Sequence, residues 1–231
     1  MQPIIQIRGL VAGYQEKVII DDLSLDIYQG KITVILGTSG CGKTTLLKNI
    51  VRLQTPFAGS IRLLGEETTT LDEKQFGELL LKVGMLFQNG ALLNSLSVFD
   101  NVALPIEQHT HITPQIIEKN VRVKLALVEL SHALHLFPSE LSGGMRKRAA
   151  LARAIALDPQ ILFADEPSAG LDPVTARGLD ELLLNLKRQL KMSMVIVTHE
   201  VASINRIADR IIFLEKGKLL FEGTLEEAHQ H

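Results

Sequence analysis

Short apolar runs rich in β-branched residues recur along the chain, each bounded by glycine or charged residues. They predict strands at "IIQI" near Ile4, "KITVIL" near Lys31, "KVGMLF" near Lys82, "QILFAD" near Gln160, "MVIVT" near Met194 and "IIFLEKGKLLFEG" near Ile211. Between several runs lie helical patterns, two of which begin with a capping side chain before proline, at Thr113–Pro114 and Asp172–Pro173. This alternation predicts an α/β fold with a largely parallel, helix-covered sheet.

Three stretches depart from the alternation. The first strand and the segment from Gly59 to Gly65 have no intervening helix, which predicts an antiparallel β flank, and the stretch from Leu92 to Ala156 is mostly helical in pattern. We therefore expect a single domain over residues 1–231. Its α/β core and β flank (1–91 and 157–231) carry an inserted helical subdomain (92–156).

Composition restricts the classes of partner. The 231 residues are 46% hydrophobic, and Lys+Arg 24 against Asp+Glu 26 gives a net charge of -2, so no overall basic field indicates nucleic acid. Cys41 as the one cysteine excludes an internal disulfide and fits a reducing compartment. No apolar run approaches the ~18 residues of a membrane span, and the N-terminus lacks a signal-peptide pattern. We expect a cytosolic protein that acts at a membrane only as a peripheral subunit.

A glycine-rich loop follows the second apolar run in "ITVILGTSGCGKTTLLKNI". It matches the G-x-x-x-x-G-K-[ST] phosphate loop between a strand and a helix, with Gly37, Thr38, Ser39, Gly40, Cys41, Gly42, Lys43 and Thr44. Its backbone N–H groups would surround phosphate oxygens, Lys43 would reach the β- and γ-phosphates, and Thr44 would ligate Mg²⁺. An ordinary glycine-rich turn is the alternative, which the placement of Lys43 and Thr44 disfavours.

Two acidic residues end a later apolar strand in "ILFADEP". Ligands of an α/β sheet bind at such C-terminal strand ends, so Asp165 is predicted to hold Mg²⁺ or its water, and Glu166 to orient and deprotonate the attacking water. Adjacent side chains leaving a strand point to opposite faces, which allows the two carboxylates different roles. The alternative is a solvated acidic loop end.

The stretch "LSGGM" opens a basic, alanine-rich helix with Ser142, Gly143 and Gly144. A hydroxyl, bare backbone and a helix N-terminus form a second anion cradle, and a phosphate loop leaves the far side of the γ-phosphate to be covered. We infer that each cradle closes on the nucleotide of a second copy. Two ATP molecules would then be sandwiched in a head-to-tail dimer.

The motifs "GTSGCGKTT", "LSGGM", "ILFADEP", "SAGLDP" and "VIVTHE" occur in this order across essentially the whole chain, which resembles an ABC-type ATPase. The resemblance implies a P-loop NTPase fold with a RecA-like core, ATP with Mg²⁺, and a nucleotide-binding set extending to Thr45. It assigns adenine stacking to Tyr14, sensing of Mg²⁺ and γ-phosphate to Gln88, communication across the dimer to Asp172, and γ-phosphate contact with support of Glu166 to His199.

Each of these residues has a plainer interpretation by itself. Tyr14 could pack on the sheet edge, His199 could be a structural histidine, and Asp172 could be only an N-cap before Pro173, or both cap and messenger. Four basic residues follow the double glycine, and they predict a solvated face or a partner contact rather than nucleic-acid binding. They are Arg146, Lys147, Arg148 and Arg153.

A narrower resemblance comes from Met145, where the family usually has glutamine. Together with "MLFQNGALLNSLSVFDNVALPIEQHT" from Met85, it makes the chain similar to the ATPase subunits of Mla/MCE-type phospholipid transporters. That similarity implies an integral-membrane permease, an MCE-type membrane-anchored protein, a small accessory subunit, phospholipid as cargo, and the cytoplasmic face of the bacterial inner membrane. The alternatives are the ATPase of a small-solute importer or lipoprotein exporter, and a non-transport ATPase in cofactor assembly.

The segment "GALLNSLSVFDNVALPI" is apolar enough to form a groove for a short helix of the permease. Packing inside the helical subdomain is the equally plain alternative for each of its apolar residues. The candidate contacts are Leu92, Leu93, Leu96, Val98 and Phe99.

Overall fold

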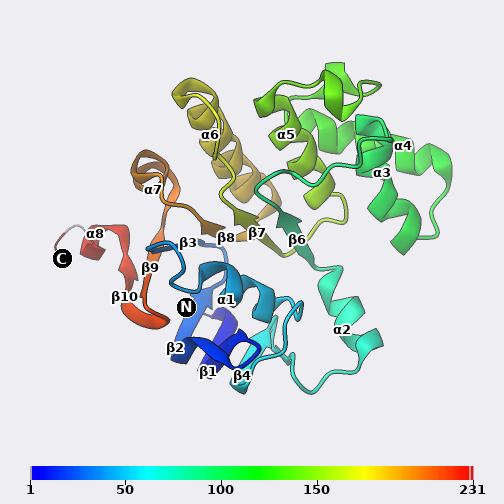
Figure 1. Ribbon diagram of the computed structural model, residues 1–231. Helices are drawn as coiled ribbons and strands as arrows, with labels where there is room; N and C mark the ends of the chain where they lie inside the picture. The colour runs from blue at the N-terminus through cyan, green and yellow to red at the C-terminus, as the bar shows by residue number, and fades with distance from the viewer. Residues whose placement is uncertain (1, 229, 231) are drawn as a thin grey trace. The chain divides into compact units, whose positions relative to one another are not determined.

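The computed structural model describes residues 2–228 and 230, while Met1, His229 and His231 lie outside the described residues. Strands and helices alternate along much of the chain (Figure 1), in agreement with the predicted α/β class. The chain divides into two compact units, one made of the residues up to Leu80 and from Ser193 onward, the other of Leu81–Met192.

An antiparallel sheet forms the β flank of the first unit, as predicted. Its strands are β1 (Pro3–Tyr14), β2 (Lys17–Tyr28), β4 (Ala58–Leu63) and β5 (Glu66–Glu67), in the order β2-β1-β4-β5. Tyr14 pairs with Lys17 at the end of the β1–β2 ladder, and the turn there places Gln15 at a positive φ of 54°. Alternating side chains of β1 bury Ile5 and Ile7 completely, so this face of the flank belongs to the core.

The remaining strands of the first unit are β3 (Ile32–Gly37), β8 (Ser193–Val197), β9 (Arg210–Glu215) and β10 (Lys218–Thr224). β3 runs parallel to β8 and β9, whereas β10 returns antiparallel to β9. β8 is buried along its whole length, as expected for a strand covered on both faces. The helices of this unit are α1 (Lys43–Ile50), α2 (Glu73–Leu80), α7 (Val201–Ile207) and α8 (Leu225–Ala228).

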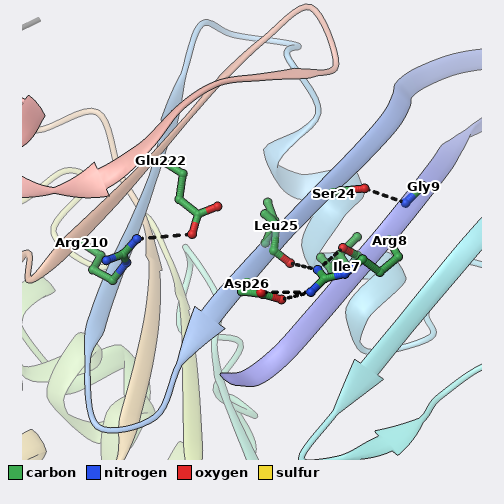
Figure 2. Close-up of polar contacts among 8 residues, drawn as sticks. All are labelled: Ile7, Arg8, Gly9, Ser24, Leu25, Asp26, Arg210 and Glu222. Atoms are coloured by element: carbon green, nitrogen blue, oxygen red, sulfur yellow. Dashed lines mark hydrogen bonds and ion pairs between the residues drawn. The ribbon is translucent and has the colours of Figure 1, made fainter. Parts of the chain in front are cut away.

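A polar cluster lies where β10 and β2 of the first unit approach each other (Figure 2). Arg210 contacts the carboxylate of Glu222 at 3.4 Å, and its guanidinium stands 4.8 Å from the centre of the Tyr28 ring. Burial raises the pKa of Glu222. The charge of Arg210 opposes this shift, and the charge of the neighbouring Asp26 adds to it. Asp26 itself pairs with Arg8 at 2.8 Å across β1 and β2.

The second unit contains two parallel strands, β6 (Val83–Leu86) and β7 (Ile161–Asp165), and four α-helices. The helices are α3 (Val98–His109), α4 (Pro114–Leu127), α5 (Gly143–Ala154) and α6 (Pro173–Leu190), with short 3₁₀ turns at Ser131–Ala133 and Pro138–Glu140. α3 to α5 fall within the stretch predicted to be helical. Among the described residues, no helix has the length and apolarity needed to cross a membrane.

Helices α4 and α6 of the second unit both begin with proline but differ in whether a side chain caps them. Pro173 and Pro114 both occupy the first turn as predicted, and the carboxylate of Asp172 accepts hydrogen bonds from the amides of Val174 at 3.0 Å and Thr175 at 3.1 Å. The predicted side-chain cap at Thr113 is wrong, because within the described chain its hydroxyl makes no cap hydrogen bond. Pro114 alone fixes the first turn there, since its φ is already helical.

Candidate functional site

The glycine-rich loop of the first unit follows β3 directly. Gly37, Gly40 and Gly42 have φ values of 150°, 77° and 109°, which side chains rarely adopt. A Cβ at Gly37 would lie 2.2 Å from the carbonyl oxygen of Leu214, and one at Gly42 would lie 3.0 Å from Ile20, whereas no described atom lies within 4 Å of a Cβ built on Gly40. The loop is therefore closely packed beneath Gly37 and Gly42 and open at Gly40.

Lys43 begins α1 and folds back over this loop. Its ammonium donates to the carbonyl oxygens of Gly37 at 2.7 Å and Thr38 at 3.0 Å. The N-cap is Gly42, which has no side chain to occupy the first-turn amides, so these N–H groups and the ammonium fit an anion such as a phosphate. Thr44 is exposed, as a predicted metal ligand should be, whereas Cys41 is buried and Thr45 packs inward.

Tyr14 ends β1 with 46% of its surface exposed, which fits the predicted stacking contact better than packing on the sheet edge. A hydrogen bond from Thr45 lowers the pKa of its hydroxyl, with Lys48 acting in the same direction. The ammonium of Lys48 lies 3.4 Å from that hydroxyl and 5.5 Å from the ring centre. Lys48 was not among the predicted site residues, and neither was Gln54, whose side-chain amide donates to the carbonyl oxygen of Gly13.

Two hollows of the first unit differ in character. One of about 420 Å³ is bordered by Tyr14, Lys48 and Phe57. An apolar one of about 740 Å³ lies among α7, β9, β10 and α8, and its described lining includes none of the predicted site residues. His199, predicted to contact the γ-phosphate, is exposed just after the buried end of β8.

The acidic residues of the second unit end β7, which is fully buried from Ile161 to Ala164. Asp165 and Glu166 are partly exposed there. Glu166 has a φ of 46°, a left-handed conformation that costs a bulky residue of order 1–3 kcal/mol. Its carbonyl oxygen accepts hydrogen bonds from the amide of Ala169 at 3.2 Å and the ammonium of Lys147 at 3.3 Å.

Gln88 opens a segment that we call the glutamine loop, residues 88–97. Its side chain is exposed, while its carbonyl oxygen accepts a hydrogen bond from Lys147. Arg153 donates to the carbonyls of Gly90 at 2.9 Å and Ala91 at 2.7 Å. Both of these residues have positive φ, 73° and 50°, so α5 binds the loop where its backbone turns.

The far end of the glutamine loop is bound by α3. The buried amide of Asn101 donates to the carbonyl oxygens of Leu93 and Leu96 at 3.1 Å each and accepts from the amide of Leu93 at 2.8 Å. Asn101 was not among the predicted site residues. An asparagine inside an apolar helical pattern is a signal for such a role, because a buried amide needs partners.

The prediction of a solvated basic face on α5 is wrong for three of its four residues. Lys147 is only 7% exposed and Arg153 is partly buried, and both donate to backbone carbonyls of their own unit. Arg148 too is partly buried and donates to the carbonyl oxygen of Val128 at 3.0 Å. Burial lowers the pKa of Lys147, an effect opposed first by the charge of Glu166. Arg146 is exposed, and Arg148 pairs with the carboxylate of Glu129 at 2.7 Å.

The glycines at the start of α5 have a packing role that the sequence did not reveal. Ser142 is the N-cap, and its hydroxyl accepts from the amide of Met145 at 3.3 Å. A Cβ on Gly144 would lie 2.6 Å from the Thr175 methyl group on α6, while one on Gly143 would meet Leu171 at an ordinary 3.4 Å. Gly144 is thus required by close helix contact, and Gly143 leaves exposed backbone at the helix N-terminus.

The residues predicted to contact a permease differ in how far their side chains are exposed. Leu93 is 45% exposed, and Leu92, Leu96 and Phe99 are partly exposed. Val98 is completely buried, so its prediction as a contact is wrong. It starts α3 facing the subdomain interior, which is the alternative left open for it.

Comparison with known proteins decides the family. The model of the ABC transporter family matches residues 20–169, which include the glycine-rich loop, the glutamine loop, the double glycine and the acidic strand end. The chain belongs to the ABC transporter family. It is an ABC-type ATPase with the predicted P-loop fold.

Curated relatives of this ATPase serve different transport systems. The intermembrane phospholipid transport system ATP-binding protein MlaF of Haemophilus influenzae is 43% identical over 229 residues, 99% of this chain and 87% of that protein. The methionine import ATP-binding protein MetN of Lactobacillus johnsonii is 38% identical over 98% of this chain and 66% of its own length. The predicted resemblance to Mla-type ATPases is confirmed by the first of these.

A solved structure shows the same fold with products bound. The dimeric ATP-binding cassette MJ0796, bound to ADP and Pi, has a TM-score of 0.87 and 29% identity, covering 96% of this chain and 98% of that one. The ATPase is therefore similar in fold to a cassette that has hydrolysed ATP.

Proposed function

We propose that this ATPase powers phospholipid transport between bacterial membranes through a partner permease. The observation that carries the proposal is the 43% identity to MlaF over 99% of the chain. Met145 supports it, because it replaces the glutamine usual in the family after the double glycine. Import of a small solute is the second candidate, favoured by the 38% identity to MetN.

The chemistry assigned to the ATP site divides among the predicted residues. Residues 37–45 hold the phosphates, with Lys43 neutralising the charge that develops on the transferred group and Tyr14 stacking on adenine. Glu166 is the general base for the attacking water, and Gln88 and His199 orient the γ-phosphate and that base. Thr44, Gln88 and Asp165 are the residues that would hold Mg²⁺, which supplies charge neutralisation at the β- and γ-phosphates.

The working form in this proposal is a head-to-tail dimer in which Ser142, Gly143 and Gly144 of one copy cover the γ-phosphate held by the other. The dimeric state of the MJ0796 cassette supports it. The exposed backbone at Gly143 and the helix N-terminus behind it suit an anion. Asp172 carries the signal between copies in addition to its observed cap.

Outside the dimer, the proposal places the ATPase on the cytoplasmic face of the inner membrane. A permease is bound there, accompanied by an MCE-type membrane-anchored protein and a small accessory subunit. The exposed Leu93 is the apolar contact expected to face the permease.

The first test is purification of the tagged ATPase from membranes in mild detergent, with mass spectrometry of co-purifying proteins and lipids. The proposal expects a permease, an MCE-type protein and bound phospholipid. A permease with a soluble solute-binding protein and no lipid would favour the importer, and a soluble partner alone would refute transport.

The second test places the purified complex in vesicles with a fluorescent phospholipid and measures transfer with ATP. Glu166→Gln is the matched control: it should still bind ATP and lose a factor of about 10²–10⁴ in turnover, the contribution of a general base. Lipid transfer that continues at the wild-type rate in Glu166→Gln would uncouple the movement from hydrolysis and contradict the proposal.

A further inference from the structure

Lys147 lies between two segments that the hydrolysis mechanism needs in fixed positions. Its ammonium donates to the carbonyl oxygen of Gln88 at the start of the glutamine loop, and to the carbonyl oxygen of Glu166 at the end of β7. Both contacts go to backbone carbonyl oxygens, so they act on the path of the chain and do not involve the side-chain atoms of Gln88 and Glu166. Lys147 itself belongs to α5, the helix that the double glycine opens.

Burial makes these contacts costly to lose. Lys147 is 7% exposed, and a buried ammonium without partners is strongly unfavourable, so its donors must remain paired. Removing the ammonium leaves the carbonyl oxygen of Gln88 without this donor and leaves the carbonyl oxygen of Glu166 to the amide of Ala169. Burial lowers the pKa of this ammonium, and the charges of Glu166 and Asp165 oppose that effect.

Backbone strain at Glu166 gives the contact a specific consequence. The φ of 46° is unfavourable for glutamate, and such a conformation persists only where surrounding contacts enforce it. The bonds from Lys147 and from the amide of Ala169 both go to the carbonyl of this strained residue. Loss of one of them allows the backbone to relax, and the carboxylate of Glu166 then moves with it.

We propose that Lys147 is a positioning residue for ATP hydrolysis. It holds the glutamine loop and the turn of Glu166 to the helix that follows the double glycine, so that the three move as one body. Arg153 reinforces the same arrangement through the carbonyls of Gly90 and Ala91, farther along the loop. The proposal rests on the roles proposed above for Glu166 and Gln88, and it assigns Lys147 no contact with ATP.

The experiment measures turnover, ATP affinity and folding of the full chain with ATP and Mg²⁺. Lys147→Met removes the ammonium while keeping an unbranched side chain, and it should lower kcat by about 10²-fold, the effect of a misplacement near 1 Å. The Kd for a fluorescent ATP analogue should stay within about twofold, because an interaction that serves the transition state changes kcat rather than binding. Lys147→Arg keeps a cationic donor and should recover part of the lost kcat.

Lys124→Met is the matched control. Lys124 is a similarly buried lysine of the same unit, with a side chain that is 5% exposed. Its ammonium pairs with the carboxylate of Asp158, and within the described residues it makes no observed hydrogen bond to a predicted site residue. It should lower the melting temperature and leave kcat per folded molecule unchanged. Hydrogen exchange should quicken in residues 88–91 and 166–169 of Lys147→Met and stay at the wild-type rate there in Lys124→Met.

Three outcomes overturn the proposal: wild-type kcat in Lys147→Met, an equal kcat loss in the Lys124 control, or an equal loss in Lys147→Met and Lys147→Arg. Glu166→Gln separates these from failure of the underlying assignment. If Glu166→Gln keeps wild-type turnover, the proposed base is wrong. If it is inactive while Lys147→Met is fully active, only the positioning role is wrong.

Discussion

Gly144→Ala tests why the helix after Ser142 opens with glycine, and it separates packing from nucleotide chemistry. The added Cβ would stand 2.6 Å from the methyl group of Thr175, nearer than real Cβ contacts come. Either the Thr175 side chain rotates or α5 moves away from α6. If Thr175 rotates, its hydroxyl loses the contact with Asp172 that helps lower the pKa of that carboxylate.

Two opposing terms set the expected magnitude. Alanine in place of glycine favours a helix by at most about 1 kcal/mol. Overpacking by one methyl group in a close contact costs about 1–3 kcal/mol. The clash is well inside the contact limit, so we expect Gly144→Ala to lower the free energy of unfolding by about 1–2 kcal/mol net.

A double substitution makes this expectation decisive. Thr175→Ser removes the methyl group in conflict and keeps the hydroxyl, so Gly144→Ala with Thr175→Ser should be at least as stable as Thr175→Ser alone in urea unfolding. ATP turnover should recover in the double variant, because the Cβ on residue 144 points toward residue 175 on α6 and leaves the exposed backbone at Gly143 open. If Gly144→Ala is more stable than wild type with Thr175 present, the packing argument is refuted. If the double variant is as stable as Thr175→Ser and still has low turnover, Gly144 acts on the nucleotide and not only through packing.

Substitutions at three further positions test other parts of the structure. Lys43→Ala should abolish binding of a fluorescent ATP analogue at concentrations that saturate wild type, since each charged hydrogen bond contributes about 1.5–3 kcal/mol; retained affinity would refute the phosphate loop. Tyr14→Ala should raise the KM for ATP more than it lowers kcat, and Tyr14→Phe should behave as wild type, whereas an unchanged KM in Tyr14→Ala would refute stacking. The raised pKa of Glu222 stabilises the folded state fully at pH values below the ordinary glutamate pKa, and this stabilisation is lost as pH rises through the raised pKa. Glu222→Gln should therefore flatten the decline in melting temperature over the pH range between these two pKa values, and an unchanged decline would contradict the assignment.

The sequence was sufficient for features in which chemistry requires a fixed spacing. The phosphate loop needs glycine, lysine and threonine at set positions after a strand, and the structure has Gly37 at the end of β3 and Lys43 at the start of α1. The acidic strand end was predictable for the same reason, since Asp165 completes the buried β7. Strand and helix periodicity then predicted the α/β class.

Contacts that depend on the direction of one side chain were harder to predict. The basic residues of α5 were interpreted together as one face, and helical periodicity alone does not separate them. Lys147 precedes the buried Ala150 and Leu151 by three and four residues, but the exposed Arg146 precedes the buried Ala149 and Ala150 at the same spacings. The backbone carbonyls that Lys147 and Arg153 bind leave no mark in the sequence.

The position of α5 within its unit explains why so much depends on one helix. Its first turn packs Gly144 against α6, next to the Asp172 cap, its second turn carries Lys147 to the backbone of Gln88 and Glu166, and its last turn carries Arg153 to the glutamine loop. A displacement of the first turn therefore reaches the other two through a rigid helix. We therefore expect that Gly144→Ala speeds up hydrogen exchange in residues 88–91 and does not slow it in any part of the chain. If exchange there is unchanged while turnover falls, the double glycine acts on nucleotide alone and the helix does not transmit its position to the glutamine loop.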